Sequence, residues 1–270
     1  MHFIKAHAYG NDFLLIPASA VTGRQDLAHL ARRVCARHRG VGADGLILYD
    51  DVNGGAPGAP GGPGISMRLF NADGSYSELS GNGVRCLAAW IVHSRGLKPG
   101  AEVVIQTDAG AKPLTLLSSE GPVHRFRAAM GKPEELRQEV LDVAGHTVTA
   151  VVLRVGNPQC VVLGPASEER LHTIAAGLAV HPYFPAGTNV ELATVEAPDR
   201  VRVLIWERGV GPTEASGTGA CAAAVAAAAF GGAARTSDVV SPGGIQRVEW
   251  TEEEIWLTGS AEIIATGDWI

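Results

Sequence analysis

Two short stretches of this 270-residue chain repeat one pattern, a hydroxyl followed by a Gly-x-Gly turn and an apolar run. An apolar run of this length predicts a helix, and glycines at a helix start expose backbone N–H groups at the positive end of the dipole. Each copy could therefore hold an anion such as a carboxylate, and two such ends would grip a single acid from both sides. The two stretches are Ser80-Gly81-Asn82-Gly83 and Ser216-Gly217-Thr218-Gly219.

Composition favours a small-molecule partner. The formal net charge is −6 and the chain has no Lys/Arg run, so it lacks the basic footprint of a protein that binds nucleic acid or an anionic membrane. Residues 1–7 show no secretory signal, which predicts a cytoplasmic location. The most apolar stretch, residues 220–230, is about half the length needed to span a bilayer and predicts a buried helix.

The four cysteines show no spacing typical of a zinc site, so no metal is expected, and a reducing compartment argues against disulfides. The simplest interpretation of each is a small buried hydrophobe. Two of them lie five or six residues beyond a Ser-Gly start, more than one helical turn inside, where their sulfurs should point into the core. The four are Cys35, Cys86, Cys160 and Cys221.

The elements expected along the chain form two similar halves. Apolar periodicity predicts helices over residues 26–38, 81–94, 168–178 and 217–230. Alternating or apolar runs predict short strands near residues 3–8, 12–16, 46–49, 67–70, 102–107, 113–117, 124–129, 148–155, 159–163, 189–194 and 201–206, and terminal strands through residues 239, 248, 255 and 263. The Gly, Pro and Ala stretch at 51–64 predicts a surface loop. We therefore expect an α+β fold with two pseudo-symmetric domains, each a mixed, mostly antiparallel sheet wrapped around a central helix. The expected domains are 1–123, completed by the strand 261–270, and 124–260.

Eight motifs, read in order, closely resemble the diaminopimelate epimerase family over nearly the whole chain. Any single Gly-x-Gly would be weak support, but the order of the set makes an accidental likeness improbable. The motifs are Gly10-Asn11-Asp12-Phe13, Arg37-His38-Arg39-Gly40-Val41-Gly42-Ala43-Asp44, Asn71-Ala72-Asp73-Gly74-Ser75, Ser80-Gly81-Asn82-Gly83, Gly156-Asn157-Pro158, Gly187-Thr188-Asn189-Val190-Glu191, Glu207-Arg208-Gly209-Val210-Gly211 and Ser216-Gly217-Thr218-Gly219.

The resemblance implies two domains that close on an amino acid, with no cofactor and no metal. The family interconverts LL- and meso-diaminopimelate by a two-base mechanism, in which a thiolate removes the α-proton and a thiol on the opposite face supplies another. Helix N-termini stabilise the charge that develops on the substrate carboxylate. Diaminopimelate is thus the expected partner, and a homodimer is possible.

The resemblance also assigns roles to residues. Arg208 suits a carboxylate because its planar fork donates two parallel hydrogen bonds. Glu207 matches the carboxylate that assists the second base. Taken alone, Asn11 could equally be a residue that only stabilises a turn. The positions that match the distal, non-reacting centre are Asn71, Asn157, Asn189 and Arg208, and those around the reacting carboxylate and amine are Asn11, Gly81, Asn82, Gly217 and Thr218.

The chain departs from the family at the reacting groups. Ser80 and Ser216 occupy the positions of the two catalytic cysteines, and Gln159 stands where most members have a histidine that assists the first cysteine. A thiol has a pKa of ~8.5 that a helix N-terminus can lower to neutrality, whereas a hydroxyl lies far outside that reach.

Three hypotheses remain open at this stage. The chain could be an epimerase in which Ser80 and Ser216 act with Glu207 as activating base. It could be a divergent isomerase or dehydratase on the same scaffold, with a carboxylate base drawn from Glu78, Glu207 or Asp44. It could also be a catalytically impaired or trapped Cys-to-Ser form that only binds the ligand.

Overall fold

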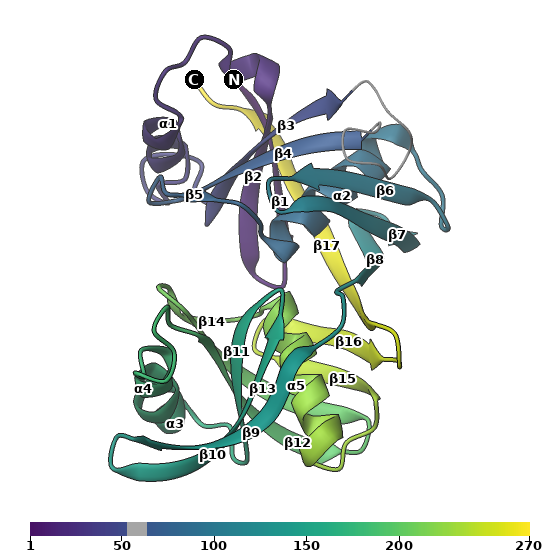
Figure 1. The fold of residues 1–270 in the computed structure, drawn as a ribbon. Coiled ribbons are helices and arrows are strands. Elements are labelled where there is room, and N and C mark those ends of the chain that lie inside the picture. Colours follow the sequence, from purple (N-terminus) through teal and green to yellow (C-terminus); the bar gives the residue numbers. More distant parts are fainter. Residues whose placement is uncertain (53–63) are drawn as a thin grey trace. The chain divides into compact units, whose positions relative to one another are not determined.

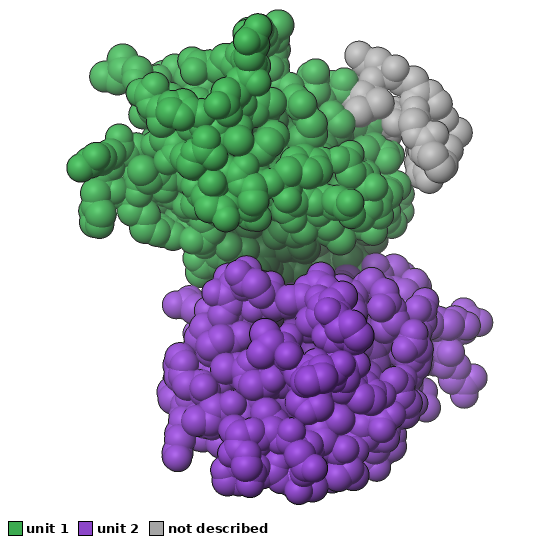
Figure 2. Space-filling model, turned by 60° about the vertical axis from the view of Figure 1, so that its left-hand side comes forward, with its two compact units in different colours: residues 1–128, 259–270 green, residues 129–258 purple. Residues whose placement is uncertain are grey.

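The computed structural model describes residues 1–52 and 64–270, and it divides into two compact units. Unit 1 comprises Met1–Ala128 and Gly259–Ile270, and unit 2 comprises Ala129–Thr258, as coloured in Figure 2. The first unit thus extends to Ala128, a few residues beyond the expected boundary at 123, because residues 123–129 form a strand that pairs with the preceding one. The loop expected at 51–64 lies almost wholly outside the described residues.

Unit 1 wraps a sheet around one helix, α2 (Figure 1). Strand β2 runs parallel to β3, β3 is antiparallel to β4, and the C-terminal strand β17 pairs with β1. The strands are β1 (His2–Ala8), β2 (Asn11–Pro17), β3 (Gly45–Val52), β4 (Gly64–Asn71), β5 (Tyr76–Ser77), β6 (Glu102–Thr107), β7 (Gly110–Glu120), β8 (Val123–Ala129) and β17 (Ile255–Asp268); the helices are η1 (Ala18–Val21), α1 (Leu27–Val34) and α2 (Gly81–Arg95).

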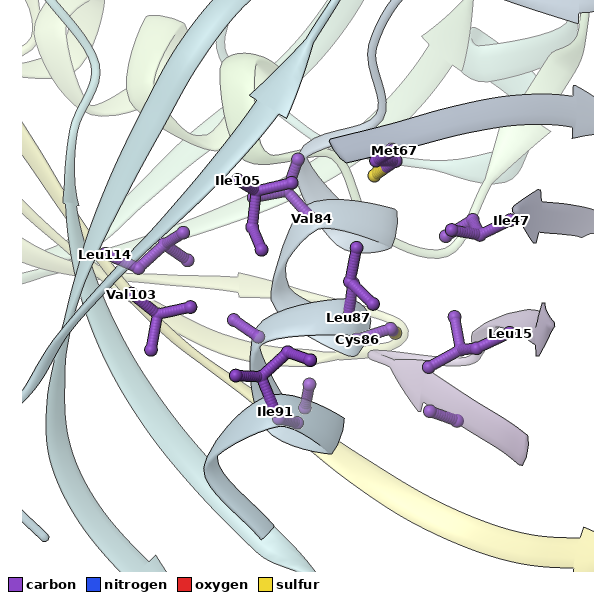
Figure 3. Packing of buried hydrophobic residues seen from close by; sticks show 14 of the residues in the cluster. Leu15, Ile47, Met67, Val84, Cys86, Leu87, Ile91, Val103, Ile105 and Leu114 are labelled. Atoms are coloured by element: carbon purple, nitrogen blue, oxygen red, sulfur yellow. The ribbon is translucent and has the colours of Figure 1, made fainter. Parts of the chain in front are cut away.

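Helix α2 is the centre of the unit 1 core. Figure 3 shows its apolar side chains, among them Leu87 and Ile91, surrounded by strand residues such as Leu15 and Ile105. The helix ends at Gly96, which adopts the left-handed region at φ 61°, where glycine carries no steric penalty. The N-terminal turn of the helix lies beside the start of β2, because Asn82 donates a hydrogen bond to Asn11, the first residue of that strand.

Unit 2 repeats this plan around α5. Strand β11 runs parallel to β12, and β12 is antiparallel to β13. The strands are β9 (Glu134–Val143), β10 (His146–Val155), β11 (Asn157–Leu163), β12 (Asn189–Ala197), β13 (Arg200–Glu207), β14 (Gly211–Thr213), β15 (Thr236–Ser241), β16 (Gly244–Trp250) and the first residues of β17; the helices are α3 (Glu168–Arg170), the π-helical turn η2 (Leu171–Ala175), α4 (Ala176–Ala179) and α5 (Gly217–Phe230).

The alanine-rich sequence of α5 fits its position. Residues from Ala220 to Ala227 are almost fully buried, and the helix contacts strands β10 to β13, β15 and β16. Small side chains on every face let strands approach the helix closely from all sides. The expected α+β class with a central helix in each half is therefore confirmed.

The shared plan makes positions in the two units equivalent. Phe13 pairs with Gly45 and Leu15 with Ile47 across β2 and β3, as Gln159 pairs with Asn189 and Val161 with Glu191 across β11 and β12. The next strand then matches Asn71, at the end of β4, with Glu207, at the end of β13. The equivalent pairs of residues are Phe13 and Gln159, Gly45 and Asn189, Ile47 and Glu191, and Asn71 and Glu207.

Some elements differ from expectation. The helix expected at 26–38 covers only Leu27–Val34, capped by Asp26, and the helix expected at 168–178 is interrupted by the π-helical turn η2. Strands β5, β9 and β14 were not expected. In the described part of the chain, no helix is long and apolar enough to cross a membrane.

Candidate functional site

Ser80 forms the N-cap of α2 in unit 1. Its backbone is extended, and its Oγ accepts a hydrogen bond of 3.1 Å from the Gly83 N–H. Serine is among the best residues for this position because it satisfies one of the free N–H groups of the first turn. Gly81 is exposed at this helix start, whereas Asn82 and Gly83 are buried. The motif thus forms a capped helix start at the position expected from the sequence, and anion binding there stays a prediction.

A hydrogen-bonded series of polar side chains fixes the asparagines beside this helix start. Asn82 Nδ2 donates to Asn11 Oδ1 at 3.2 Å, and Asn11 Nδ2 donates to Asp44 Oδ2 at 2.9 Å. Arg85 donates to Asn82 Oδ1 from the other side. Asp44 is in turn anchored by Arg37 at 2.7 Å. Asn11 and Asn82 are therefore held in one orientation before any ligand arrives.

Asn71 lies at the end of β4, next to the same group. Its Nδ2 donates to Ser75 Oγ at 2.9 Å, and the N–H of the following residue, Ala72, donates to the Asp44 carbonyl at 2.9 Å. The side chain of Asn71 is exposed. Unit 1 thus gathers five of the expected site residues at one end of its sheet: Asn11, Asn71, Ser80, Gly81 and Asn82.

Ser216 caps α5 in unit 2 in the same way. Its Oγ accepts a hydrogen bond of 3.3 Å from the Gly219 N–H and lies 3.4 Å from Thr218 Oγ1. The residue is 6 % exposed, and Gly217 is buried with it. The second helix start is therefore more enclosed than the first.

Glu207 approaches this hydroxyl from the end of β13. Burial raises the pKa of its carboxyl, and a hydrogen bond with the Ser216 side chain acts in the opposite direction. A carboxylate that accepts a proton from a hydroxyl is the arrangement expected of a general base. Among the candidate bases, Glu207 is thus in contact with one of the two serines.

The remaining expected residues of unit 2 lie at the same end of the sheet. Gln159 is fully buried and donates from Nε2 to Asn157 Oδ1 at 2.6 Å. Asn189 Oδ1 accepts a hydrogen bond of 2.9 Å from the backbone N–H of Arg208. The exposed Arg208 guanidinium donates to the Ala186 carbonyl at 2.9 Å, which leaves most of its donors for a ligand.

Glu191 was assigned no role from the sequence, yet it belongs to this group. It is 0 % exposed, and neither carboxyl oxygen has a hydrogen-bond partner. It shares a face of β12 with Asn189, two residues earlier, because side chains alternate along a strand. An acidic residue within the apolar run from Val190 to Ala193 was the available signal.

The other candidate groups are less well placed. Glu78 is exposed on the surface. Asp44 is paired with Arg37 and accepts hydrogen bonds from Asn11 and the Asp12 N–H. Cys86 and Cys221 are fully buried, as expected, and burial raises the pKa of Cys86 far above its ordinary value. No group of three His, Cys, Asp or Glu side chains in the described ranges is arranged to hold a metal ion.

Close packing at Gly219 yields a testable prediction. A Cβ at this position would lie 2.7 Å from Glu191 Oε1 and 3.2 Å from Ser216 Cβ, whereas one at Gly81 would meet nothing within 4 Å. We expect Gly219→Ala to lower the free energy of unfolding by about 1–3 kcal/mol because the site is overpacked. The control Gly81→Ala should leave it unchanged or raise it by up to ~1 kcal/mol. Urea unfolding of both variants measures the difference, and equal stabilities would contradict this packing.

Comparison with known proteins agrees with this architecture. The family model described as Diaminopimelate epimerase matches residues 3–136 and 151–264. A diaminopimelate epimerase of Desulforudis audaxviator is 39 % identical, covering 100 % of this chain and 99 % of that protein. One of Moorella thermoacetica is 38 % identical, covering 99 % of each.

Solved structures show the same fold at low identity. A predicted epimerase from Pseudomonas aeruginosa superposes with a TM-score of 0.72 at 14 % identity, covering 100 % of this chain and 99 % of that one. A hydroxyproline epimerase from Agrobacterium vitis gives 0.69 at 14 % identity, covering 99 % and 90 %. Fold and site together define an isomerase built from two repeated α+β units. On the family match and the identity of its relatives, the chain belongs to the diaminopimelate epimerase family.

Proposed function

We propose that this protein is a cofactor-independent, cytoplasmic epimerase that interconverts LL- and meso-diaminopimelate. The observation that carries the proposal is the presence of two capped helix starts, one in each unit, each with polar side chains beside it that the resemblance assigns to the ligand. The high identity to proteins named diaminopimelate epimerase supports the same ligand.

Substrate binding uses fixed groups. The N-termini of α2 and α5 offer backbone N–H groups to the α-carboxylate next to the reacting carbon. Negative charge moves into that carboxylate when the α-proton leaves, so donors already in place stabilise the transition state. Arg208, together with Asn71, Asn157 and Asn189, is proposed to hold the distal amino-acid group.

Proton transfer on the unit 2 side runs through Ser216 and Glu207. Ser216 Oγ takes the α-proton from the substrate while its own hydroxyl proton passes to the Glu207 carboxylate. One C–H bond and one O–H bond break and two O–H bonds form, so the charge moves from Glu207 to the substrate. This relay avoids a free serine alkoxide, which neutral pH would not support.

The opposite face of the carbon is assigned to Ser80, whose hydroxyl delivers a proton to the carbanion while a solvent molecule protonates its Oγ in the same step, so that no free alkoxide forms. Ser80 is partly exposed, as this step requires, and Glu207 returns its proton to solvent after the product leaves. Gln159 does not titrate and is proposed to orient Asn157 through its 2.6 Å hydrogen bond. A hydroxyl is a much weaker acid than the thiol of other family members, so turnover is expected to be slow.

Solvent isotope exchange tests this function. We expect LL-diaminopimelate in deuterium oxide to lose its α-proton signal and to give the meso isomer when the protein is present, as followed by proton NMR. The Ser80→Ala, Ser216→Ala double variant is the control and should show neither change. Calorimetric binding of diaminopimelate without any α-proton exchange at high protein concentration would overturn the catalytic proposal.

A further inference from the structure

The most unusual side chain of unit 2 is Glu191, on the face of β12 that packs against α5. It is fully buried, and neither of its carboxyl oxygens has a hydrogen-bond partner. Its Oε1 lies 2.7 Å from the position that a Cβ on Gly219 would occupy, in the first turn of α5. This carboxyl is therefore directed at the helix start that Ser216 caps.

Few titratable groups surround Glu191. From β13, the negative charge of Glu207 acts on it. From β11, the buried thiol of Cys160 is close enough to sense its charge, and burial keeps that thiol protonated. Helix α5 contributes one titratable side chain, the fully buried Cys221. No positive side chain contributes to its ionisation in the described structure.

Burial and this neighbourhood decide the charge state of Glu191. An ionised carboxylate without hydrogen bonds or a cationic partner is strongly unfavourable in a protein interior, so such a group retains its proton. Burial raises the pKa of Glu191, and the charge of Glu207 raises it further. Glu207 is less enclosed and is hydrogen-bonded to Ser216, which favours its charged form. Glu207 therefore ionises before Glu191 as the pH rises.

Unit 1 has no counterpart of this pair. At the positions equivalent to Glu191, Glu207 and Gln159, the repeated sheet places Ile47, Asn71 and Phe13. A Cβ on Gly83 would meet Ile47 Cδ1 at 3.0 Å, just as one on Gly219 would meet the Glu191 carboxyl. The two helix starts share their geometry, but the strand side chains next to them differ: they are carboxyl groups in unit 2 and have no ionisable counterpart in unit 1.

We propose that Glu191 is a positioning residue that retains one proton beside Glu207 and so confines the single negative charge of the pair to Glu207, next to Ser216. This deepens the proposed function and rests on it, since it places removal of the α-proton on the unit 2 side of the site. When Glu191 loses its proton, a second negative charge next to Ser216 opposes carbanion formation.

Infrared spectroscopy tests the charge state without substrate. At neutral pH we expect a carboxylic-acid C=O band that disappears in Glu191→Gln and persists in Glu196→Gln, a control on the same strand whose side chain pairs with Arg200 and Arg202. In Glu207→Gln the band should titrate at lower pH, because one negative charge next to Glu191 is gone. Absence of the band from the unaltered protein at neutral pH would overturn the proposal. A Glu207→Gln band that titrates as in the unaltered protein would do the same, even if Glu191→Gln does not fold.

Stability gives a second readout that is independent of activity. Above the ordinary glutamate pKa the unfolded chain has released the Glu191 proton and the folded protein still holds it, so the free energy of unfolding falls as pH rises. Glu191→Gln should make the free energy of unfolding fall less steeply with pH, and Glu196→Gln should leave the slope unchanged. A decline that is equally steep in Glu191→Gln would count against the proposal.

The pH profile of α-proton exchange connects Glu191 with the reaction. We expect exchange by the unaltered protein to decrease at high pH, and Glu191→Gln to remove that decrease, because glutamine resembles the protonated carboxyl and cannot ionise. A merely structural role would leave the profile unchanged. If exchange is absent but the infrared band is present, the proposed function fails and the assignment of the proton to Glu191 stands.

Discussion

Replacement of both cap serines, Ser80→Cys with Ser216→Cys, is expected to raise the rate of α-proton exchange by about 10²- to 10⁴-fold, the usual contribution of a well-matched acid–base group. Each serine is the N-cap of a helix, where unpaired N–H groups and the dipole stabilise a thiolate. A thiol starts from a pKa of ~8.5, so a modest shift brings it into the working range. Exchange in deuterium oxide, followed by NMR, measures the gain.

The same substitution should lower stability, because sulfur is a poorer cap than oxygen. Loss of each cap is expected to reduce the free energy of unfolding by about 1 kcal/mol. Ser167→Cys is a matched control, since Ser167 caps α3 by accepting a hydrogen bond of 3.3 Å from the Arg170 N–H. It should lose stability without gaining exchange. A double variant that folds and binds diaminopimelate but exchanges no faster would show that these serines are not at the reacting carbon.

The central helices and most strands could be predicted from the sequence because their patterns are local. Helix α5 covers the residues that were expected, since the Ser-Gly start marks its N-terminus and the alanine run has a high helix propensity. Strand β9 was not expected because its sequence, from Glu134 to Val143, carries charged residues at half of its positions. It forms because the neighbouring strand β10 supplies its backbone hydrogen bonds, and backbone pairing is not a property of one strand's side-chain pattern.

The site was predictable where it consists of caps and turns, and less so where it depends on register. Ser80, Ser216 and the asparagines lie in Gly-rich turns that can be recognised in the sequence by their glycines. Glu191 lies inside an apolar strand, and only the pairing of β11 with β12 places its carboxyl on the α5 face next to Glu207. One residue of slippage would have turned it away from the helix. Its role therefore could not be derived without the fold.

The two units show how one scaffold can carry unequal chemistry. Both present a serine-capped helix start, but the strands next to it offer Ile47 and Phe13 in unit 1 and Glu191 and Gln159 in unit 2. In the proposed mechanism the apolar pair offers Ser80 no carboxyl relay, so Ser80 acts only as the hydroxyl that delivers a proton on its face. Removal of the α-proton is therefore assigned to the Ser216 side, where burial also strengthens electrostatic interactions.

Removal of the Arg208 side chain is expected to have the second large effect, a loss of about 10²-fold in kcat/KM, mostly as a higher KM. Arg208 keeps most of its donors free, and Asn189 fixes its backbone through a hydrogen bond of 2.9 Å. A guanidinium fork bound to a carboxylate is a strong charge-assisted contact, and truncation of such a partner typically costs 2–5 kcal/mol when the pair is desolvated, so about 3 kcal/mol is expected because the bound substrate covers the guanidinium from solvent. Arg208→Lys keeps the charge but loses the fork, so its loss should be intermediate.

Two comparisons make this prediction specific. Arg202→Ala, on β13, the strand that ends just before Arg208, removes a side chain paired to Glu196 at 2.6 Å and should leave kcat/KM unchanged. Lysine lacks the distal carboxylate, so any exchange that the protein supports with lysine should be equally slow with and without the Arg208 guanidinium. If Arg208→Ala reduced exchange of lysine and diaminopimelate by the same factor, Arg208 would serve the reacting centre or the fold, and the distal carboxylate would need another partner. A loss confined to diaminopimelate would assign the distal carboxylate to Arg208, because only that substrate offers its fork two oxygens.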